Sequence, residues 1–121
     1  MNHVSVPTQV LDALHDITHL YRNRMREELH QHDERLTRNA MRYVLYVGYH
    51  PLCTHKELME YLHADKAQVA RTLNEIEDNG WIERVPHPED KRSRRLQLSA
   101  QGKALFNAMR KRRAKVGETM L

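Results

Sequence analysis

The sequence predicts an α+β fold that is mostly helical, in which a helix-turn-helix is followed by a β-hairpin. Apolar residues recur every three or four positions through most of the chain, as they do along the buried face of a helix. A polar turn at residues 63–65 separates two such segments, and residues 95–98 alternate between polar and apolar, as a half-buried strand does. A chain of 121 residues has room for one core, so we expect a single domain over residues 1–121.

Two helices are expected before the helix-turn-helix. The first spans residues 8–31, about 24 residues or ~36 Å, which is long for so small a domain. Its apolar stripe consists of Leu14, Ile17, Tyr21, Met25 and Leu29. We expect part of this stripe to pack against a second chain. Thr37 is expected to cap a second helix that ends near Gly48.

The helix-turn-helix begins at a capping box. In Thr54-His55-Lys56-Glu57, the side chains of the threonine and the glutamate can each satisfy a backbone N–H of the other, which starts a short third helix. Asp65 is expected to cap a fourth helix, and Gly80 closes it because glycine tolerates a positive φ. The apolar line of this fourth helix consists of Val69, Leu73 and Ile76.

A hairpin and a last helix complete the predicted fold. Trp81–Val85 and Arg95–Leu98 have strand character, and Pro86 starts the break between them. We expect the two strands to pair and to carry a polar, basic tip. Ser99 then caps a last helix over residues 100–121, whose apolar line consists of Leu105, Met109 and Val116.

Composition excludes several classes of protein. Hydrophobic residues make up 40% of the chain and charged residues 30%, which is too apolar for a disordered protein. The longest apolar run, Tyr43–Tyr49, is far shorter than the roughly 20 residues of a membrane span. The N-terminus has neither the basic start nor the apolar region of a secretory signal. The single cysteine cannot form an internal disulfide, so we expect a cytoplasmic protein.

The net charge of +4 favours a nucleic-acid partner, but its distribution matters more than its size. Residues 99–121 contain six basic residues and one acidic residue, whereas residues 54–98 contain eight basic and nine acidic residues. The case for DNA therefore depends on where the basic residues of the middle segment lie.

One face of the fourth helix has the side chains that a recognition helix needs. At about 100° per residue, Ala67, Arg71 and Asn74 lie opposite the apolar line, flanked by Gln68. In the major groove glutamine pairs with adenine, arginine with guanine, and the alanine methyl meets the methyl of thymine. Lys66 and the helix N-terminus favour phosphate. Any solvated helix also has a polar outward face, so the helix alone leaves both interpretations open.

The hairpin tip favours DNA binding. Its basic residues repel one another and add nothing to a core; they are Lys91, Arg92, Arg94 and Arg95. Arginine is favoured in the narrow, negative minor groove, and Asp90 is close enough in sequence to orient Arg92. The alternative interpretation is a loop that only keeps the chain in solution.

The segment Asp90–Gly102 carries a family resemblance. It resembles the wing signature of the MarR family of winged-helix transcriptional regulators, D-x-R-x-x-x-x-x-L-[T/S]-x-x-G, at every fixed position. Residues 69–84 resemble the recognition helix of that family and the entry to its wing. The resemblance covers roughly residues 8–115. It implies a winged helix-turn-helix lobe over residues 37–98, with N- and C-terminal dimerisation helices at residues 8–31 and 100–121.

The resemblance also implies a function and a set of contacts. We expect a sequence-specific regulator, a repressor, that binds a pseudo-palindromic operator in double-stranded DNA as a homodimer. The expected major-groove residues are Lys66, Ala67, Gln68, Arg71, Thr72 and Asn74. The expected wing contacts to the minor groove or phosphates are Lys91, Arg92, Ser93, Arg94 and Arg95, with Asp90 orienting them. Thr54 and Asp65 are expected to cap helices or bind phosphate.

Family members have a further C-terminal helix that clasps the first helix of the partner, whereas this sequence ends at Leu121. Either the sequence is a piece of a longer protein, or the first and last helices present form the dimer. Tyr21, Tyr43, Tyr46 and Tyr49 either pack in the core or line a pocket, where members of the family bind phenolic or other aromatic acids as effectors.

Other functions are weighed against this one. Four glycines leave little for a phosphate-binding loop and no nucleophile triad is visible, so we expect neither an enzyme nor a cofactor. His15 and His19 have the i,i+4 spacing of metal ligands without a further ligand pattern, so no metal is expected. The alternatives that stay open are a winged-helix module for protein interaction and a regulator that senses metal or, through Cys53, oxidant.

Overall fold

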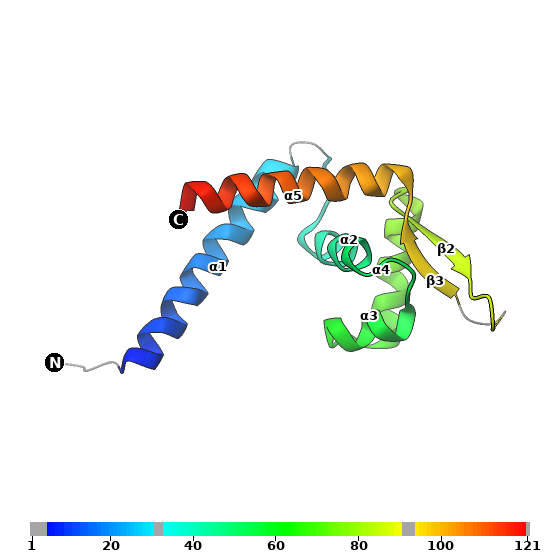
Figure 1. Ribbon diagram of the computed structural model, residues 1–121, viewed down its shortest axis with the longest axis horizontal. Coiled ribbons are helices and arrows are strands. Elements are labelled where there is room, and N and C mark those ends of the chain that lie inside the picture. The colour runs from blue at the N-terminus through cyan, green and yellow to red at the C-terminus, as the bar shows by residue number, and fades with distance from the viewer. Residues whose placement is uncertain (1–4, 31–32, 91–93, 121) are drawn as a thin grey trace.

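The computed structural model describes residues 5–30, 33–90 and 94–120. The elements follow one another as α1 (Val6–His30), α2 (Arg38–Tyr49), β1 (Cys53–Thr54), α3 (His55–Leu62), α4 (Lys66–Asp78), β2 (Ile82–Pro86), β3 (Arg94–Leu98) and α5 (Ala100–Met120). In Figure 1 the helices α2, α3 and α4 form a lobe with the β2–β3 hairpin at one side, and α5 runs along the top of this lobe toward α1. The predicted α+β fold, mostly helical, is confirmed.

Side-chain caps start three of the helices where the sequence predicts them. Thr37 accepts a hydrogen bond from the backbone N–H three residues later, at the start of α2. Thr54 and Glu57 form the predicted capping box of α3, with donor–acceptor distances of 3.1 and 3.2 Å. Asp65 caps α4 in the same way, and Gly80 follows α4 with a φ of 83°. Local sequence chemistry therefore sets the boundaries of these helices.

The hairpin belongs to a three-stranded antiparallel sheet with the order β1-β3-β2. β2 pairs with β3 along its whole length, from Ile82 opposite Leu98 to Pro86 opposite Arg94. Pro86 therefore ends the strand instead of breaking it, and Arg94 belongs to the ladder and not to the tip. The third strand, at residues 53–54, is not predicted from the sequence because two residues are too few to show a period of two.

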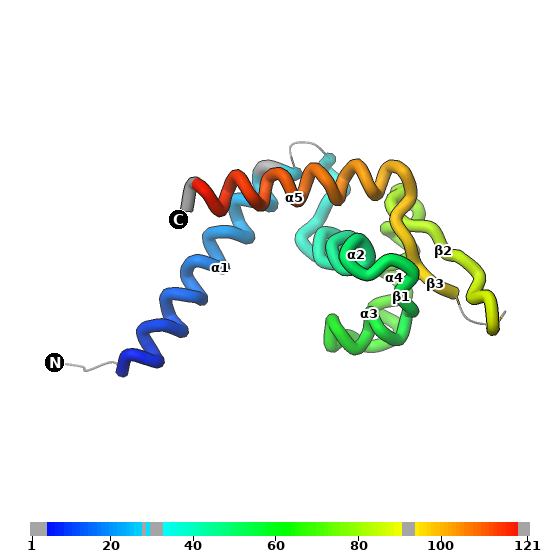
Figure 2. Tube along the Cα trace, in the orientation of Figure 1, coloured from blue at the N-terminus to red at the C-terminus, as the bar shows by residue number. Residues whose placement is uncertain are grey.

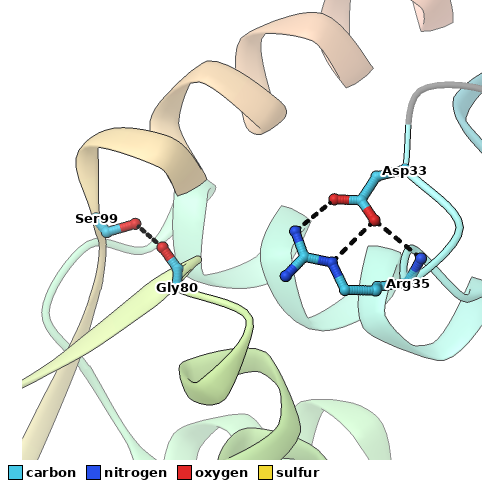
Figure 3. Close-up of polar contacts among 4 residues, drawn as sticks. All are labelled: Asp33, Arg35, Gly80 and Ser99. Atoms are coloured by element: carbon cyan, nitrogen blue, oxygen red, sulfur yellow. Dashed lines mark hydrogen bonds and ion pairs between the residues drawn. The ribbon is translucent and has the colours of Figure 1, made fainter.

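Ser99 links the start of α5 to the end of α4 through hydrogen bonds. Its hydroxyl accepts a hydrogen bond from the backbone N–H of Gly102 at 3.0 Å and donates one to the carbonyl of Gly80, as Figure 3 shows. A Cβ atom on Gly102 would collide with the carbonyl oxygen of Trp81. The close approach of the two backbones gives a physical reason for the last glycine of the wing signature.

The loop between α1 and α2 contacts the base of the hairpin. The carboxylate of Asp33 binds the guanidinium of Arg35, with Oδ2 2.7 Å from Nη2 and Oδ1 3.0 Å from Nε (Figure 3). The guanidinium lies 5.3 Å from the centre of the Trp81 ring. Stacking of this cation on the indole holds the loop against the hairpin.

α2 extends one residue past its predicted end near Gly48. A Cβ atom at Gly48 would meet the ring of Phe106 from α5, so the glycine admits this ring and does not end the helix. The helix is capped by His50, whose N–H donates to the carbonyl of Tyr46 at 2.9 Å. The sequence predicts Gly48 as the cap of α2, whereas in the structure Gly48 is a packing contact between α2 and α5 and His50 is the cap.

α1 is buried along only part of its length. Met25 and Leu29 lie in the core with exposed fractions of 3% and 1%. The N-terminal half carries six exposed apolar residues, with exposed fractions from 44% to 69%: Val6, Val10, Leu11, Leu14, Ile17 and Leu20. We call these six the α1 stripe. Figure 2 shows this half of the helix running away from the rest of the molecule, so one chain leaves the α1 stripe uncovered. None of the helices in the described ranges has the length and apolar content that a membrane span requires.

Candidate nucleic-acid interface

α4 presents a polar face to solvent. Ala67, Gln68 and Arg71 are exposed, as is Lys66 in the first turn, while Val69 on the opposite side is fully buried. Among the described residues, none forms a hydrogen bond or ion pair with the Arg71 guanidinium. This face therefore offers an amide, a methyl group and a free guanidinium, which are the groups that read base edges in a major groove.

The N-terminus of α4 is occupied by its own cap. The Oδ1 atom of Asp65 accepts a hydrogen bond from the N–H of Gln68 at 2.8 Å. This carboxylate brings a negative charge to the place where the sequence suggests a phosphate. The Lys66 ammonium at this end of α4 carries a charge that suits a phosphate. The Thr54 hydroxyl is likewise bonded within its own capping box, to Glu57 at 3.0 Å.

Thr72 does not belong to the exposed face. Its exposed fraction is 8%, and its Oγ1 accepts a hydrogen bond from Asn39 of α2 at 3.3 Å. A side chain held between two helices cannot reach a base edge. The expected major-groove contact is therefore wrong for Thr72, which instead joins α4 to α2.

Asn74 is exposed but already bonded. Nη2 of Arg84 donates to its Oδ1 atom at 2.7 Å, and Nε of the same guanidinium lies 2.8 Å from Oε2 of Glu77. Arg84 lies in β2, so it bridges the hairpin to α4. The sequence does not predict this contact, because one arginine in a strand carries no signal for a partner ten residues away.

The described part of the wing contains two of its expected basic residues. Arg94 is exposed at the start of β3. Arg95 is half-buried between Thr54 and Val85 of the neighbouring strands, so it is less available than Arg94. Asp90 is exposed. The expected contacts of Lys91, Arg92 and Ser93 lie outside the described residues.

His55 lies beside α4 and close to the positive charges of Arg84 and Lys66. Burial lowers its pKa, and the charges of Arg84 and Lys66 lower it further. The Nε2 atom of this imidazole is buried, and no hydrogen bond to it exists among the described residues. The ring is therefore neutral at neutral pH, next to two fixed cations.

Proteins of known class are similar to this chain. The HTH-type transcriptional regulator BilQ of Clostridium symbiosum (strain WAL-14163) is 33% identical over 73 residues, which cover 60% of this chain and 51% of that protein. The chain spans about half the length of the curated relatives that it matches. FabT of Streptococcus pneumoniae, solved in complex with DNA, has a TM-score of 0.81 at 21% identity, covering 93% of this chain and 79% of that one. A mutant MarR of E. coli, solved with operator DNA, has a TM-score of 0.66 at 27% identity, covering 88% and 73%.

The sequence model of the MarR family matches residues 36–93, from the start of α2 to the hairpin. The chain is therefore similar to the MarR family over these residues. The predicted resemblance to the MarR family is confirmed over residues 36–93, and so is the winged helix-turn-helix fold.

The chain has a groove of about 900 Å³ lined by α1, α2, α3 and α5. Four tyrosines and four arginines are among its lining residues: Tyr21, Tyr46, Tyr49, Tyr61, Arg22, Arg38, Arg42 and Arg113. None of the lining residues in the described ranges is acidic. Tyr43 is 1% exposed and lies in the core, so the pocket interpretation fails for this tyrosine and holds for the other three.

The aromatic rings of the groove contact neighbouring rings and a guanidinium. The ring of Tyr46 lies 4.4 Å from that of His50 and 4.5 Å from that of Tyr61. The guanidinium of Arg113 lies 6.0 Å from the centre of the Tyr21 ring. Burial raises the pKa of Tyr21, and Arg113 opposes that rise. The phenol is therefore neutral and the guanidinium charged, and a groove of this chemistry suits an aromatic anion.

The structure gives little support to redox or metal sensing through Cys53 or the described histidines. Cys53 is 3% exposed, and burial together with the charge of Glu57 raises its pKa to about 11. A thiol in that state is a poor nucleophile. His15 and His19 stack at 6.3 Å. Across residues 5–30, 33–90 and 94–120, histidine, cysteine and carboxylate side chains nowhere gather in a group of three that could bind a metal.

Proposed function

We propose that this chain is a sequence-specific DNA-binding repressor of transcription of the MarR family and not an enzyme. The observation that carries the proposal is the exposed face of α4, with Gln68 and an unpartnered Arg71, beside a hairpin that carries Arg94. Two of the similar structures contain DNA, and the similar proteins with curated names are transcriptional regulators. A further similar structure is described as a Multiple Antibiotic Resistance Repressor, with a TM-score of 0.78.

The contacts follow from the position of each side chain. Ala67, Gln68 and Arg71 meet base edges in the major groove, with Asn74 one turn further along α4. Lys66 binds a phosphate. The wing follows the adjacent minor groove through Arg94 and Arg95 and through Lys91, Arg92 and Ser93, with Asp90 orienting them. Thr54 and Asp65 act as helix caps.

We propose a homodimer because of the uncovered α1 stripe. Six apolar side chains in a row are unfavourable in water, and a long helix that leaves its own domain suits a second copy of the same helix. In this division the single domain has dimerisation helices at residues 8–31 and 100–121 and a DNA-binding lobe at residues 37–98. Two copies place their α4 helices about one turn of DNA, ~34 Å, apart on a pseudo-palindrome.

The first test is selection of bound sequences from a random DNA pool. A two-fold symmetric consensus, bound with a steep fall in affinity as salt rises, supports the proposal because each neutralised phosphate releases counterions. Binding that is absent, or that lacks any consensus, contradicts it and favours the protein-interaction module.

A pair of variants tests the role of α4 in the same assay. Arg71→Ala is expected to cost ~1–3 kcal/mol at one base pair of each half-site and to relax the preference there. Lys111→Ala removes one charge from an exposed position on α5 and serves as the control. It should leave the consensus unchanged. If Arg71→Ala lowers the affinity equally for every DNA sequence, Arg71 contacts a phosphate and not a base.

We propose that a small aromatic acid bound in the groove releases the DNA. The groove joins α1 and α5 to the DNA-binding lobe, so a ligand there can shift one against the other. The probe is 4-hydroxybenzoate, with benzyl alcohol as the uncharged control. The proposal is supported if 4-hydroxybenzoate releases the DNA and if Arg42→Ala weakens this release. It is contradicted if the acid and the alcohol have equal effects, or if neither has an effect.

A further inference from the structure

Arg84 connects the hairpin to two side chains of α4. Its Nη2 donates to Oδ1 of Asn74 at 2.7 Å, and its Nε lies 2.8 Å from Oε2 of Glu77. Asn74 and Glu77 are three residues apart, so they lie on the same side of α4. One guanidinium therefore binds two neighbouring positions of the helix from the adjacent strand.

The bond to Arg84 determines which end of the Asn74 amide stays free. An amide has a carbonyl that accepts and an amino group that donates, whereas a guanidinium has only donors. The carbonyl oxygen must therefore face Arg84. The Nδ2 amino group is left over, and no described residue accepts a hydrogen bond from it.

Asn74 lies on the same exposed face as the other expected reading residues. At about 100° per residue, it is about 20° from Ala67 and about 60° from Arg71 around the helix. All three side chains are exposed. A duplex that meets Arg71 therefore also comes close to the free amino group of Asn74.

We propose that Arg84 is a positioning residue for base recognition, which fixes Asn74 as a hydrogen-bond donor. The proposal rests on the proposed binding of α4 in a major groove. A donor at this position favours a base that offers an acceptor there, which is guanine through O6 and N7, thymine through O4 or adenine through N7. It disfavours cytosine, whose edge offers the N4 amino group. An asparagine without Arg84 can turn its amide over and accept from that group.

A variant of Glu77 distinguishes the two effects of Arg84, which are neutralisation of a charge and orientation of the Asn74 amide. The ion pair neutralises a carboxylate near the DNA, whereas the bond to Asn74 orients an amide. Glu77→Gln removes the charge but leaves an oxygen that can still accept from Nε. This variant therefore keeps the orientation of Asn74 and serves as the matched control.

The experiment compares selected consensus sequences from a random DNA pool for the wild type and the variants. The wild type should disfavour cytosine at one position of each half-site by about fivefold, the effect of one hydrogen bond. Arg84→Met should lose this preference at that position and keep the others. Asn74→Asp still accepts from Arg84 but cannot donate to a base, and it should reverse the preference toward cytosine.

Rescue distinguishes orientation of the amide from a general structural role. Arg84→Lys retains a group that only donates and should keep the wild-type preference, as should Glu77→Gln. If Arg84→Met leaves the preference unchanged, or if it weakens all positions alike while its melting temperature stays the same, the inference is wrong although DNA binding stands. If the wild type binds no DNA, both the inference and the proposed function fail.

Discussion

Replacing Gly102 by alanine tests whether close backbone packing holds α5 to the base of the hairpin. A Cβ atom there would collide with the carbonyl oxygen of Trp81, lie 2.9 Å from its carbonyl carbon and lie 3.3 Å from Cβ of Leu98. Backbone atoms cannot rotate away as the end of a long side chain can. The start of α5 would therefore have to shift, together with the Ser99 cap.

Two opposing terms give the size of the effect. Overpacking typically costs about 1–3 kcal/mol, and a clash with a backbone carbonyl belongs at the upper end. Alanine in place of glycine inside a helix returns about 1 kcal/mol. The net loss in the free energy of unfolding is then ~2 kcal/mol, or a fall of roughly 8 °C in Tm for a domain of this size.

Gly117 provides the control in the same helix. A Cβ atom on Gly117 would have no neighbour within 4 Å, so Gly117→Ala gains helix propensity without a clash. It should raise the free energy of unfolding by up to ~1 kcal/mol. Both variants are unfolded in urea at equal protein concentration, followed by circular dichroism. If the two variants are equally stable, the collision at Gly102 does not exist and the reasoning fails.

Three further predictions follow from buried groups and from the groove. Because burial raises the pKa of Cys53 to about 11 from 9.0, its alkylation by iodoacetamide at pH 8 should be about 100-fold slower in the folded chain than in urea; equal rates would show an accessible thiolate. The pKa of His55 is lowered by burial and by Arg84 and Lys66, so the unfolded chain takes up the proton first. The contribution of His55 to the free energy of unfolding is then fully present above about pH 6.5 and is lost as the pH falls below it. In urea titrations at pH 7 and pH 5, His55→Gln should reduce the loss of stability between the two pH values. If this variant loses as much stability as the wild type, other groups cause the loss. Tyr46→Ala should weaken the binding of 4-hydroxybenzoate, measured by calorimetry, because it removes the ring that packs between those of His50 and Tyr61; unchanged affinity would place the ligand elsewhere.

The features that local chemistry determines could be predicted from the sequence. Thr54, Asp65 and Gly80 mark the ends of helices because a side-chain oxygen or a missing Cβ acts within a few residues of itself. The exposed face of α4 follows from the helical period. The wing signature adds the position of the hairpin.

The features that depend on partners far along the chain could not be predicted. Thr72 is buried because Asn39 of α2 lies beside it, 33 residues away. Pro86 can end a strand because it lies at the edge of the sheet, where its missing N–H costs nothing. Tyr43 and Tyr46 lie in the same helix, but Tyr43 is in the core and Tyr46 lines the groove. This difference depends on how other elements pack against the helix, which the sequence of the helix does not contain.

The strand order also bears on self-association of the sheet. β3 is paired on both sides, and β2 keeps an open edge. Along that edge lie Glu83 and Arg84, which are charged and exposed, and Pro86, which has no N–H to offer. An incoming strand from another molecule would have to bury charged side chains and would meet an interrupted ladder at Pro86, so this edge disfavours strand-to-strand association between molecules.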